Sequence, residues 1–405
     1  MRAFERFLKY AAVHTASSDE GTETPSTDRQ FVLARMLERE LMSLGASDVY
    51  VDEHCFVYGR VPATEGLEKV PAVAFIAHLD TVPDFPGENV RPRLIENYGG
   101  GDIALGGSGR VLSPAEFPDL DSARGKTLIV TDGTTVLGAD DKAGIAEIMT
   151  ALERLISGGR PHGTVCVAFC PDEEIGHGAE LLDLKRLGAE CAYTLDGGAL
   201  CGIEYENFNA AAASVEIRGK NVHPGSAKNI MINASLVAME YNAMLPACDT
   251  PRNTEGYEGF FHLTDMSGDV AAASLSYIIR DHDGAKFEAR KALCLHAAKV
   301  LNEKYGEGTV TVNLREQYRN MLEKIRPRFE VVEKANEAAR RCGLEPEAVP
   351  IRGGTDGARL SFRGLPCPNL PTGGNAYHGP FEHIAAEDMD VCVDLVLEII
   401  KAFTE

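Results

Sequence analysis

The sequence predicts an α/β protein in which a mixed sheet is flanked by helices and a smaller α+β domain is inserted. Three observations predict this fold. Short runs that are apolar on both faces alternate with helical periodicity in the first half of the chain, as in buried parallel strands joined by helices. Near residue 209 the pattern changes to apolar–polar alternation, which is typical of antiparallel strands with one exposed face. Helical periodicity then returns toward the end of the chain.

The first part of the chain, residues 1–208, contains most of the α/β sheet. Two amphipathic stretches begin it, and Gly45 is placed to end the second helix. Apolar runs then indicate buried strands, and residues 85–126, rich in Gly, Pro, Asp and Asn, indicate loops and short strands. The predicted elements are helices over 1–14, 28–44 and 142–156 and strands over 72–77, 164–169 and 192–195.

The second part, residues 209–317, is the predicted inserted α+β domain. Its elements are expected to alternate between strand and helix, over 213–218, 234–245, 273–280, 286–304 and 309–315. The third part, residues 318–405, carries helical patterns over 329–342 and 386–403. We expect these two helices to return to the first sheet, so that parts one and three form one catalytic domain.

Charge and composition exclude several classes of function. The 405 residues carry 61 acidic and 40 basic side chains, a net charge of −21, which is unsuited to nucleic acid or an anionic membrane surface. No apolar run approaches the ~20 residues that span a bilayer, and the N-terminal M-R-A-F-E-R-F-L-K-Y is too charged for a signal peptide. The ten cysteines are scattered without a C-x-x-C pair, so we expect reduced thiols and a cytoplasmic protein.

Side chains able to bind metal ions or move protons gather in five short segments, each after a predicted strand or in a glycine-rich turn. Ligands of open α/β sheets bind outside the carboxyl ends of the strands, so we expect these segments to meet. Each alone has an ordinary explanation, such as a helix cap or a solvated acidic loop. The segments are A-H-L-D-T-V-P-D (77–84, with His78 and Asp80), L-G-A-D-D-K-A-G (137–144, with Asp140), C-P-D-E-E-I-G-H-G (170–178, with Glu173 and Glu174), T-L-D-G-G (194–198, with Asp196) and T-G-G-N-A-Y-H-G (372–379, with His378).

Together the five segments hold the ligands for a pair of metal ions. Two histidines and three carboxylates suit two zinc ions that share one aspartate and one hydroxide, and the charges of such a cluster balance. Asp80 lies two residues after His78, on the same side of an extended chain, and can hydrogen-bond its second ring nitrogen. Glu173 and Glu174 point to opposite sides in extended backbone, so one can bind metal while the other acts as a base. We expect His177 to be a bystander.

These segments and several others resemble a known enzyme family. The further matches are Y-E-N-F-N-A-A, N-V-H-P-G-S-A-K-N, T-E-G-Y-E-G-F-F-H-L, I-I-R-D-H-D, I-R-G-G-T-D-G-A-R-L-S-F and L-P-C-P-N-L-P-T-G-G-N-A-Y-H-G. Over nearly its whole length the chain resembles the peptidase T family of cytosolic tripeptide aminopeptidases, part of the aminoacylase and carboxypeptidase G superfamily of dinuclear zinc hydrolases. The resemblance implies a zinc-exopeptidase-like catalytic domain and makes the inserted domain a lid.

The resemblance also implies which residues bind metal. His78 and Asp196 would bind one zinc ion, and Glu174 and His378 the other. Asp140 would bridge the two ions, and the peptide bond after it would be cis. One departure is visible after the last ligand, where this chain reads G-P-F-E-H-I and the family suggests a more basic stretch. The role of His383 in that stretch, and the rim of the pocket, stay open.

Other residues receive roles in catalysis and peptide binding from the same resemblance. Glu173 would be the general base, and Asp80 would orient the first ligand histidine. His223, in the lid, would reach the oxyanion, although the residues alone favour a turn histidine before a proline. Arg280 and Arg352 would anchor the carboxylate or carbonyls of the peptide, although exposed arginines are usually only solvated.

The predicted function is therefore that of a metal-dependent aminopeptidase that releases the N-terminal residue from tripeptides. We expect two Zn²⁺ ions per subunit, with Co²⁺ or Mn²⁺ as substitutes, and short peptides as partners, but no nucleic acid and no membrane. The resemblance allows a homodimer. The alternatives are a dipeptidase, carboxypeptidase or N-acyl amino acid deacylase of the same superfamily, since the metal-site motifs do not separate these activities. A non-catalytic binding protein would predict a broken ligand set, whereas all the positions here hold competent residues.

Overall fold

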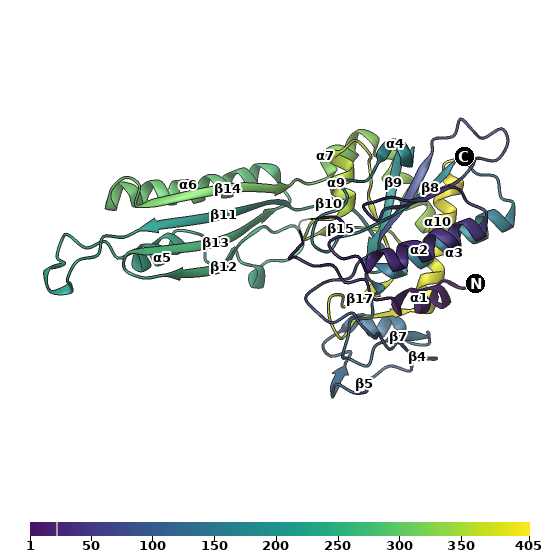
Figure 1. Cartoon of the computed structure of the whole chain (residues 1–405), viewed down its shortest axis with the longest axis horizontal. Coiled ribbons are helices and arrows are strands. Elements are labelled where there is room, and N and C mark those ends of the chain that lie inside the picture. Colours follow the sequence, from purple (N-terminus) through teal and green to yellow (C-terminus); the bar gives the residue numbers. More distant parts are fainter. Residues whose placement is uncertain (22) are drawn as a thin grey trace. The chain divides into compact units, whose positions relative to one another are not determined.

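The computed structural model describes residues 1–21 and 23–405, which divide into two compact units (Figure 1). Unit 1 comprises Met1–Tyr205, Glu323–Val349 and Thr355–Glu405, and unit 2 comprises Glu206–Leu322 and Pro350–Gly354. The main segment of unit 2 begins a few residues before the predicted start of the insertion, 209, and ends a few residues after its predicted end, 317. Unit 2 also includes a short segment that the sequence assigns to the third part.

Unit 1 is built around a mixed sheet of eight strands, in the order β1-β2-β8-β3-β9-β16-β10-β15. The strands β8, β3, β9 and β16 run parallel, and the pairs β1–β2, β2–β8 and β16–β10 are antiparallel. The prediction of a mixed sheet is confirmed. The bounds are β1 Ser47–Val51, β2 Val57–Val61, β3 Val73–His78, β8 Val165–Cys170, β9 Cys191–Gly197, β10 Gly202–Asn207, β15 Glu347–Ile351 and β16 Asn369–Pro371.

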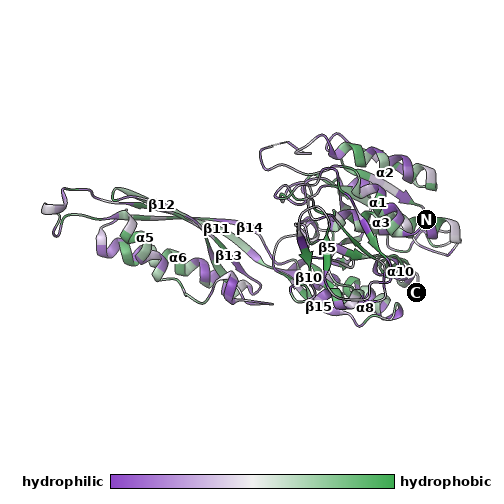
Figure 2. Ribbon diagram, turned by 90° about the horizontal axis from the view of Figure 1, so that it is seen from below, coloured by the Kyte–Doolittle hydropathy of each residue, from purple (hydrophilic) through white to green (hydrophobic). Residues whose placement is uncertain are grey.

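Helices cover both faces of this sheet, which explains the continuous apolar runs. On one face α3 packs against β3 and β9 and is in turn covered by α1 and α10. On the other face Ala74 and Ile76 of β3 pack with Leu187 and Leu360, and Figure 2 shows hydrophobic residues gathered on the interior strands. The helices of unit 1 are α1 Ala3–Ala11, α2 Gln30–Leu44, α3 Ala139–Gly158, α4 Leu184–Leu187, α8 Glu330–Arg341, α9 Asp356–Phe362 and α10 Ala386–Ala402, with the short α7 Leu322–Ile325 at its edge.

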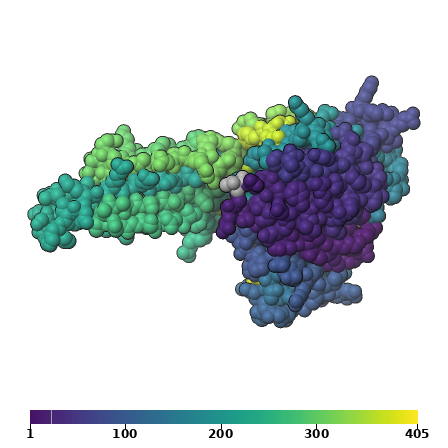
Figure 3. Space-filling model, in the orientation of Figure 1, coloured from purple at the N-terminus to yellow at the C-terminus, as the bar shows by residue number. Residues whose placement is uncertain are grey.

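The N-terminal helices are tied to the helix that carries the candidate site. In Figure 3 the N-terminal residues, in purple, spread over the outer surface of unit 1. The guanidinium of Arg6 in α1, only 2% exposed, donates to Glu40 of α2 and to Thr150 and Glu153 of α3. The helix α2 ends at Gly45 with φ +93°, as predicted, because only glycine adopts this left-handed conformation without strain.

Smaller sheets in unit 1 position the C-terminal turn of the site. The predicted region of loops and short strands contains β4 Arg93–Ile95, β5 Ile103–Leu105 and β6 Arg110–Leu112, followed by β7 Leu128–Val130. A four-stranded sheet then has the order β17-β18-β7-β4, with β17 Gly374–Asn375 and β18 His383–Ala385. Since β18 pairs with β7, the turn that follows β17 is held beside the segment that leads into α3.

Unit 2 is an α+β domain with one antiparallel sheet of four strands, in the order β12-β13-β11-β14. Its two longer helices, α5 Ala234–Ala243 and α6 Gly284–Tyr305, lie on the same face of the sheet (Figure 2). They bury Tyr241 and Phe287 against Val215 and Leu275. The strands are β11 Asn209–Arg218, β12 Phe260–Gly268, β13 Ala272–Asp281 and β14 Val310–Tyr318.

The sequence misses one strand of this domain and several in unit 1. The prediction of three strands for the insertion is wrong, because β12 is a fourth. It lies at the edge of the sheet and most of its residues are exposed, so it lacks the alternating pattern that marks β11 and β13. The strands β1, β2, β10, β15 and β16 are also unpredicted; all but β10 have five residues or fewer, and most lie toward the edges of the main sheet. No helix in the described part of the chain is long and apolar enough to cross a membrane.

Candidate metal centre

The five predicted ligands come together in unit 1, at the edge of the sheet where its parallel strands end. His78 is the last residue of β3, Glu174 follows β8, and Asp196 lies near the end of β9. Asp140 stands in the first turn of α3, and His378 lies in the turn between β17 and β18. Parallel strands present their carboxyl ends at one edge, which is why side chains so distant in sequence meet here.

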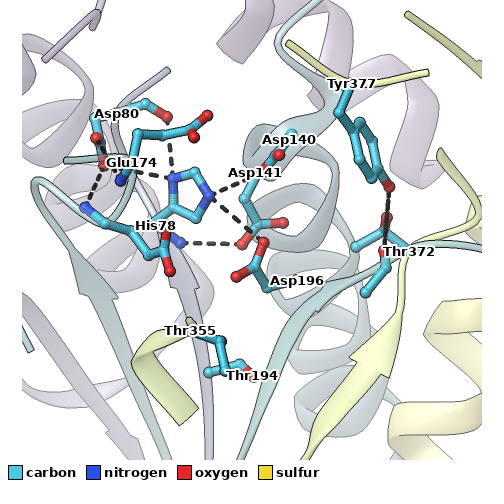
Figure 4. Close-up of polar contacts among 12 residues, drawn as sticks. His78, Asp80, Asp140, Asp141, Glu174, Thr194, Asp196, Thr355, Thr372 and Tyr377 are labelled. Carbon is cyan, nitrogen blue, oxygen red and sulfur yellow. Dashed lines mark hydrogen bonds and ion pairs between the residues drawn. The ribbon is translucent and has the colours of Figure 1, made fainter. Parts of the chain in front are cut away.

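The two oxygens of Asp140 face two different groups of ligand atoms. The His78 Nε2 atom is 2.8 Å from Asp140 Oδ1 and 3.5 Å from Asp196 Oδ1. The His378 Nε2 atom is 3.1 Å from Asp140 Oδ2 and 3.0 Å from Glu174 Oε2. Figure 4 shows His78 between Asp80 on one side and Asp140 and Asp196 on the other. One carboxylate therefore joins two sets of donors, each with one imidazole nitrogen and one further carboxylate.

These donor sets fit divalent cations in their chemistry and spacing. With metal–ligand bonds of about 2.0–2.1 Å, neighbouring ligands of a tetrahedral zinc ion lie roughly 3.3 Å apart, close to the separations seen here. Imidazole and carboxylate donors suit zinc and related transition metals. Asp141 is a further candidate that the sequence did not suggest, because one of its oxygens lies within 4.8 Å of donor atoms of His78 and Asp196. Its Oδ2 atom already accepts the backbone N–H of His78 at 3.0 Å.

The electrostatics of the cluster also favour a cation. Burial raises the pKa of Asp196 to about 6, and burial together with Asp140 raises the pKa of Glu174 to about 7. Burial would lower the pKa of His78, but its carboxylate neighbours outweigh this effect and raise it. The carboxylates of Asp140 and Glu174, which accept hydrogen bonds from the imidazole, raise the pKa of His378 to about 11. Crowded, buried carboxylates are costly unless positive charge accompanies them, whether as protons or as metal ions.

One side of the site is more open than the rest. The side chain of His378 is 52% exposed, whereas that of His78 is 3% exposed and that of Glu174 is 5% exposed. A ligand from solvent would therefore reach the cluster past His378.

Asp80 contacts both the first ligand histidine and the segment that carries the two glutamates. His78 Nδ1 lies 3.1 Å from the backbone oxygen of Asp80 and 3.4 Å from its Oδ1. The same carboxylate accepts the backbone N–H of Glu173 at 3.0 Å and of Glu174 at 3.2 Å. The contact with His78 agrees with the orienting role that the resemblance implies. The bonds to the backbone of 173 and 174 were not predicted, because hydrogen bonds to a backbone leave no pattern in the sequence.

The segment that carries Glu173 is held from its other side by Asp172. The Asp172 carboxylate accepts the backbone N–H and the hydroxyl of Ser26 and the amide of Gln30, each at 2.6 Å. Burial and the nearby carboxylates of Asp196 and Asp356 raise the pKa of Glu173 well above its usual value. A raised pKa makes a carboxylate a stronger base, which is the property that general-base catalysis needs. His177 is exposed on the flank of this turn.

The loop that presents Asp140 needs a glycine one turn into α3. The Asp140–Asp141 peptide bond is cis, as the resemblance implies. A Cβ atom on Gly144 would lie 2.1 Å from the backbone oxygen of Leu195 and 2.4 Å from Asp141 Oδ1. Glycine at this position therefore lets α3 approach the strand end that carries Asp196.

Replacing Gly144 by alanine is expected to destabilise the protein by about 1–3 kcal/mol, because the added methyl group overlaps backbone that cannot move aside easily. The matched control is Gly158→Ala at the other end of α3, where nothing lies within 4 Å of the added carbon. That change is expected to be neutral or slightly stabilising. Urea unfolding of the two variants measures the difference, and equal stabilities would contradict the close packing described here.

Hydrogen bonds that the sequence did not indicate hold the turn around His378 in place. The Tyr377 hydroxyl lies 2.8 Å from Thr372 Oγ1 (Figure 4). It also donates to the backbone oxygen of Gly197, the residue after Asp196, at 3.1 Å. His383, whose role was open, is buried and pairs through Nε2 with Asp119 at 2.7 Å. Its function here is to anchor the strand that follows the turn.

The three predicted peptide-binding residues lie in unit 2. His223 is exposed, and its Nδ1 atom accepts the N–H of Gly225 at 3.1 Å. Arg280 is half-buried, with its guanidinium 5.3 Å from the centre of the Tyr318 ring. Both terminal nitrogens of Arg352 donate to the loop 254–258, to the backbone oxygens of residues 254, 256 and 258 and to a threonine hydroxyl.

Comparison with known proteins assigns the family. Residues 136–402 match the model of the peptidase family M20/M25/M40. The chain is 54% identical over 403 residues to a protein named peptidase T from Desulfitobacterium hafniense, covering 99% of this chain and 98% of that protein. The crystal structure of aminopeptidase PepT from Bacillus cereus superposes with a TM-score of 0.79 at 25% identity, over 100% of this chain and 98% of that one.

A more distant structure shares the fold. The YXEP protein of Bacillus subtilis, described as a dinuclear metal binding peptidase from the M20 family, superposes with a TM-score of 0.63 at 14% identity, over 99% of this chain and 98% of that one. The match to the family model extends over more than half of the chain, and the similarity to the Desulfitobacterium protein over almost all of it. This chain therefore belongs to the peptidase family M20/M25/M40.

Proposed function

We propose that this peptidase is a metal-dependent aminopeptidase that releases the N-terminal residue from tripeptides. The observation that carries the proposal is the arrangement around Asp140. Each of its two carboxylate oxygens faces a different histidine–carboxylate pair. A carboxylate in this position can bind both ions of a hydrolytic metal pair. The high identity to a protein named peptidase T and the similarity to aminopeptidase PepT support the choice of reaction and substrate.

The proposed cofactors are two divalent ions. One would be held by His78 and Asp196, and the other by His378 and Glu174. Asp140 would bind both ions. Zinc fits the mixture of imidazole and carboxylate donors best, and Co²⁺ and Mn²⁺ accept the same donors. When bound, a metal pair of this kind polarises the scissile carbonyl and lowers the pKa of water at neutral pH.

In the proposed reaction, Glu173 takes a proton from the attacking water and passes it to the leaving amine. Asp80 keeps this base in place through the backbone of residues 173 and 174. Because Nδ1 of His223 accepts a hydrogen bond, Nε2 carries the proton and can donate to the oxyanion when the proposed lid closes. Arg280 and Arg352 are proposed to anchor the carboxylate or carbonyls of the peptide. Both already make hydrogen bonds within unit 2, Arg280 to the backbone oxygens of residues 211 and 279 and Arg352 to the loop 254–258.

We also propose that the enzyme works in the cytoplasm, in peptide catabolism. The ten cysteines, all in the described part of the chain, are unpaired, and most are buried, which suits a reducing compartment. The homodimer stays a prediction.

Chelation is expected to abolish the activity reversibly. The purified enzyme is treated with a chelator and assayed for free amino acid released from a tripeptide, a dipeptide, an N-acetylated amino acid and an N-acetylated tripeptide. Release from the free tripeptide should exceed release from the other three, should vanish with chelator and should return with added Zn²⁺, Co²⁺ or Mn²⁺. The blocked tripeptide is the matched control, because it keeps every peptide bond and lacks only the free amino group.

Other results of this assay would identify a different activity. Preference for the N-acetylated amino acid would indicate a deacylase, preference for the dipeptide a dipeptidase, and release of the C-terminal residue a carboxypeptidase. Cleavage that is insensitive to chelator would contradict the metal-dependent mechanism.

A further inference from the structure

Glu382 is a buried carboxylate that contacts the loop of the proposed bridging ligand. Its residue is 1% exposed. The Oε2 atom accepts the backbone N–H of Leu137 at 2.6 Å and of Gly138 at 2.9 Å, and Oε1 accepts the backbone N–H of Asp140 at 3.0 Å. One side chain thus binds three of the N–H groups that lead into α3.

These three N–H groups need an acceptor from outside the helix. Leu137 and Gly138 precede α3, where the chain turns at Gly138 with φ +76°. Asp140 lies in the first turn of α3, where N–H groups have no partner within the helix. A carboxylate satisfies several of them at once and interacts favourably with the positive end of the helix dipole. Glu382 therefore stabilises the start of α3. Its bond to the Asp140 N–H also affects a proposed metal ligand.

The bond to Asp140 fixes that residue from its backbone side. Its carboxylate lies between the two histidines, so the position of its backbone decides whether both oxygens reach their partners. Glu382 stands four residues after His378, in the same turn. That turn is itself anchored, because the next residue, His383, pairs with Asp119 and begins β18. This one anchored turn therefore supplies one proposed ligand, His378, and contacts the backbone of another, Asp140.

We propose that Glu382 is a positioning residue for the metal pair, holding Asp140 where its two oxygens can serve both ions. The proposal rests on the proposed function, since it concerns the metal site on which that function depends. Groups that orient metal ligands typically change metal affinity by about 10- to 100-fold when they are removed. We expect an effect of that size from Glu382, although it touches no metal and no substrate.

The substitution Glu382→Gln should remove, in particular, the hydrogen bond from the Asp140 N–H to residue 382. A glutamine has one acceptor oxygen and one NH₂ group. If the oxygen keeps the two bonds to residues 137 and 138, the NH₂ group faces the N–H of Asp140 and repels it. The matched control is Glu387→Gln, because Glu387 also accepts a backbone N–H, that of Thr127 at 2.8 Å, and its side chain takes no part in the Asp140 loop.

The test titrates the metal-free proteins with Co²⁺ and follows the visible absorption of the bound ion, without peptide. Glu382→Gln should bind Co²⁺ about 10- to 100-fold more weakly than the unsubstituted protein, and Glu387→Gln should match it. A melting temperature of each metal-free protein checks folding separately. If Glu382→Gln melts lower but binds Co²⁺ normally, Glu382 is only a helix cap and the proposal is overturned.

A second variant decides the case in which Glu382→Gln does not fold. Glu382→Asp keeps the charge and both oxygens but withdraws them by one methylene. Weaker Co²⁺ binding by Glu382→Asp than by Glu387→Gln supports the proposal, and equal binding overturns it. The unsubstituted protein separates this proposal from the proposed function, because failure of that protein to bind Co²⁺ at all would contradict the metal centre itself.

Discussion

An Asp140→Ala protein is expected to bind neither metal ion tightly and to lose at least about 1000-fold of its tripeptidase activity. Asp140 is the one side chain within hydrogen-bonding distance of both histidine Nε2 atoms, at 2.8 Å and 3.1 Å, among the described ligands. Removing it takes one ligand from each ion at once. Metal ions of this kind contribute several kcal/mol to transition-state stabilisation, which corresponds to about three powers of ten in rate.

Single-site variants distinguish bridging from ordinary ligation. Metal content per protein, measured after gel filtration, should fall from two ions toward none in Asp140→Ala. It should fall toward one in Asp196→Ala and in His378→Ala, because each of these residues belongs to only one of the two donor sets: Asp196 lies beside His78 Nε2, and His378 Nε2 faces only Oδ2 of Asp140. Asp121→Ala serves as the control, since Asp121 is exposed and pairs with Arg124 on the surface. Two tightly bound ions in Asp140→Ala would show that Asp140 does not bridge.

A Glu173→Gln protein is expected to keep both metal ions and lose about 100- to 10,000-fold in kcat, the range that a well-placed general base contributes. The substitution preserves the size of the side chain and its backbone bond to Asp80, but the amide cannot accept a proton. Turnover of a tripeptide and metal content, measured on the same preparation, test both parts of this expectation.

The neighbouring glutamate is the sharpest comparison for this prediction. Glu174→Gln should lower metal content as well as turnover, because Glu174 Oε2 lies 3.0 Å from His378 Nε2 within the proposed ligand set. Glu190→Gln, an exposed change farther along the chain, should alter neither. Normal turnover by Glu173→Gln would remove Glu173 from the role of base, and loss of metal from it would make Glu173 a ligand.

Elements with a strong hydrophobic pattern could be predicted from the sequence. The strand β3 is apolar at every position before His78 because helices cover both of its faces, and the prediction over 72–77 is confirmed within one residue. The helices α6 and α10 are likewise predicted to within two residues at each end. In contrast, β12 was missed because an exposed edge strand need not alternate. Short strands such as β16, with three residues, carry too little pattern to be seen.

The residue types of the candidate site could be predicted from the sequence, but the hydrogen bonds that hold these residues in place could not. Histidines and carboxylates at the ends of apolar strands are visible in the sequence, since burial of such groups needs a reason. The hydrogen bonds that hold the site through backbone N–H groups, from Glu173 to the Asp80 carboxylate and from Asp140 to the Glu382 carboxylate, gave no such signal. In the sequence, a glutamate that accepts hydrogen bonds from the backbone of a distant segment cannot be distinguished from any other glutamate.

The sequence by itself therefore determined the parallel strands and the set of residues that end on them, because apolar periodicity and strand direction are local properties. It also carried the family resemblance that paired His78 with Asp196 and His378 with Glu174. Only the tertiary structure decided that each oxygen of Asp140 lies near a different histidine, and which hydrogen bonds hold the loop of Asp140. Asp140 and His378 are far apart along the chain, and their separation in space depends on the packing of α3, β7 and β18, which no local pattern encodes.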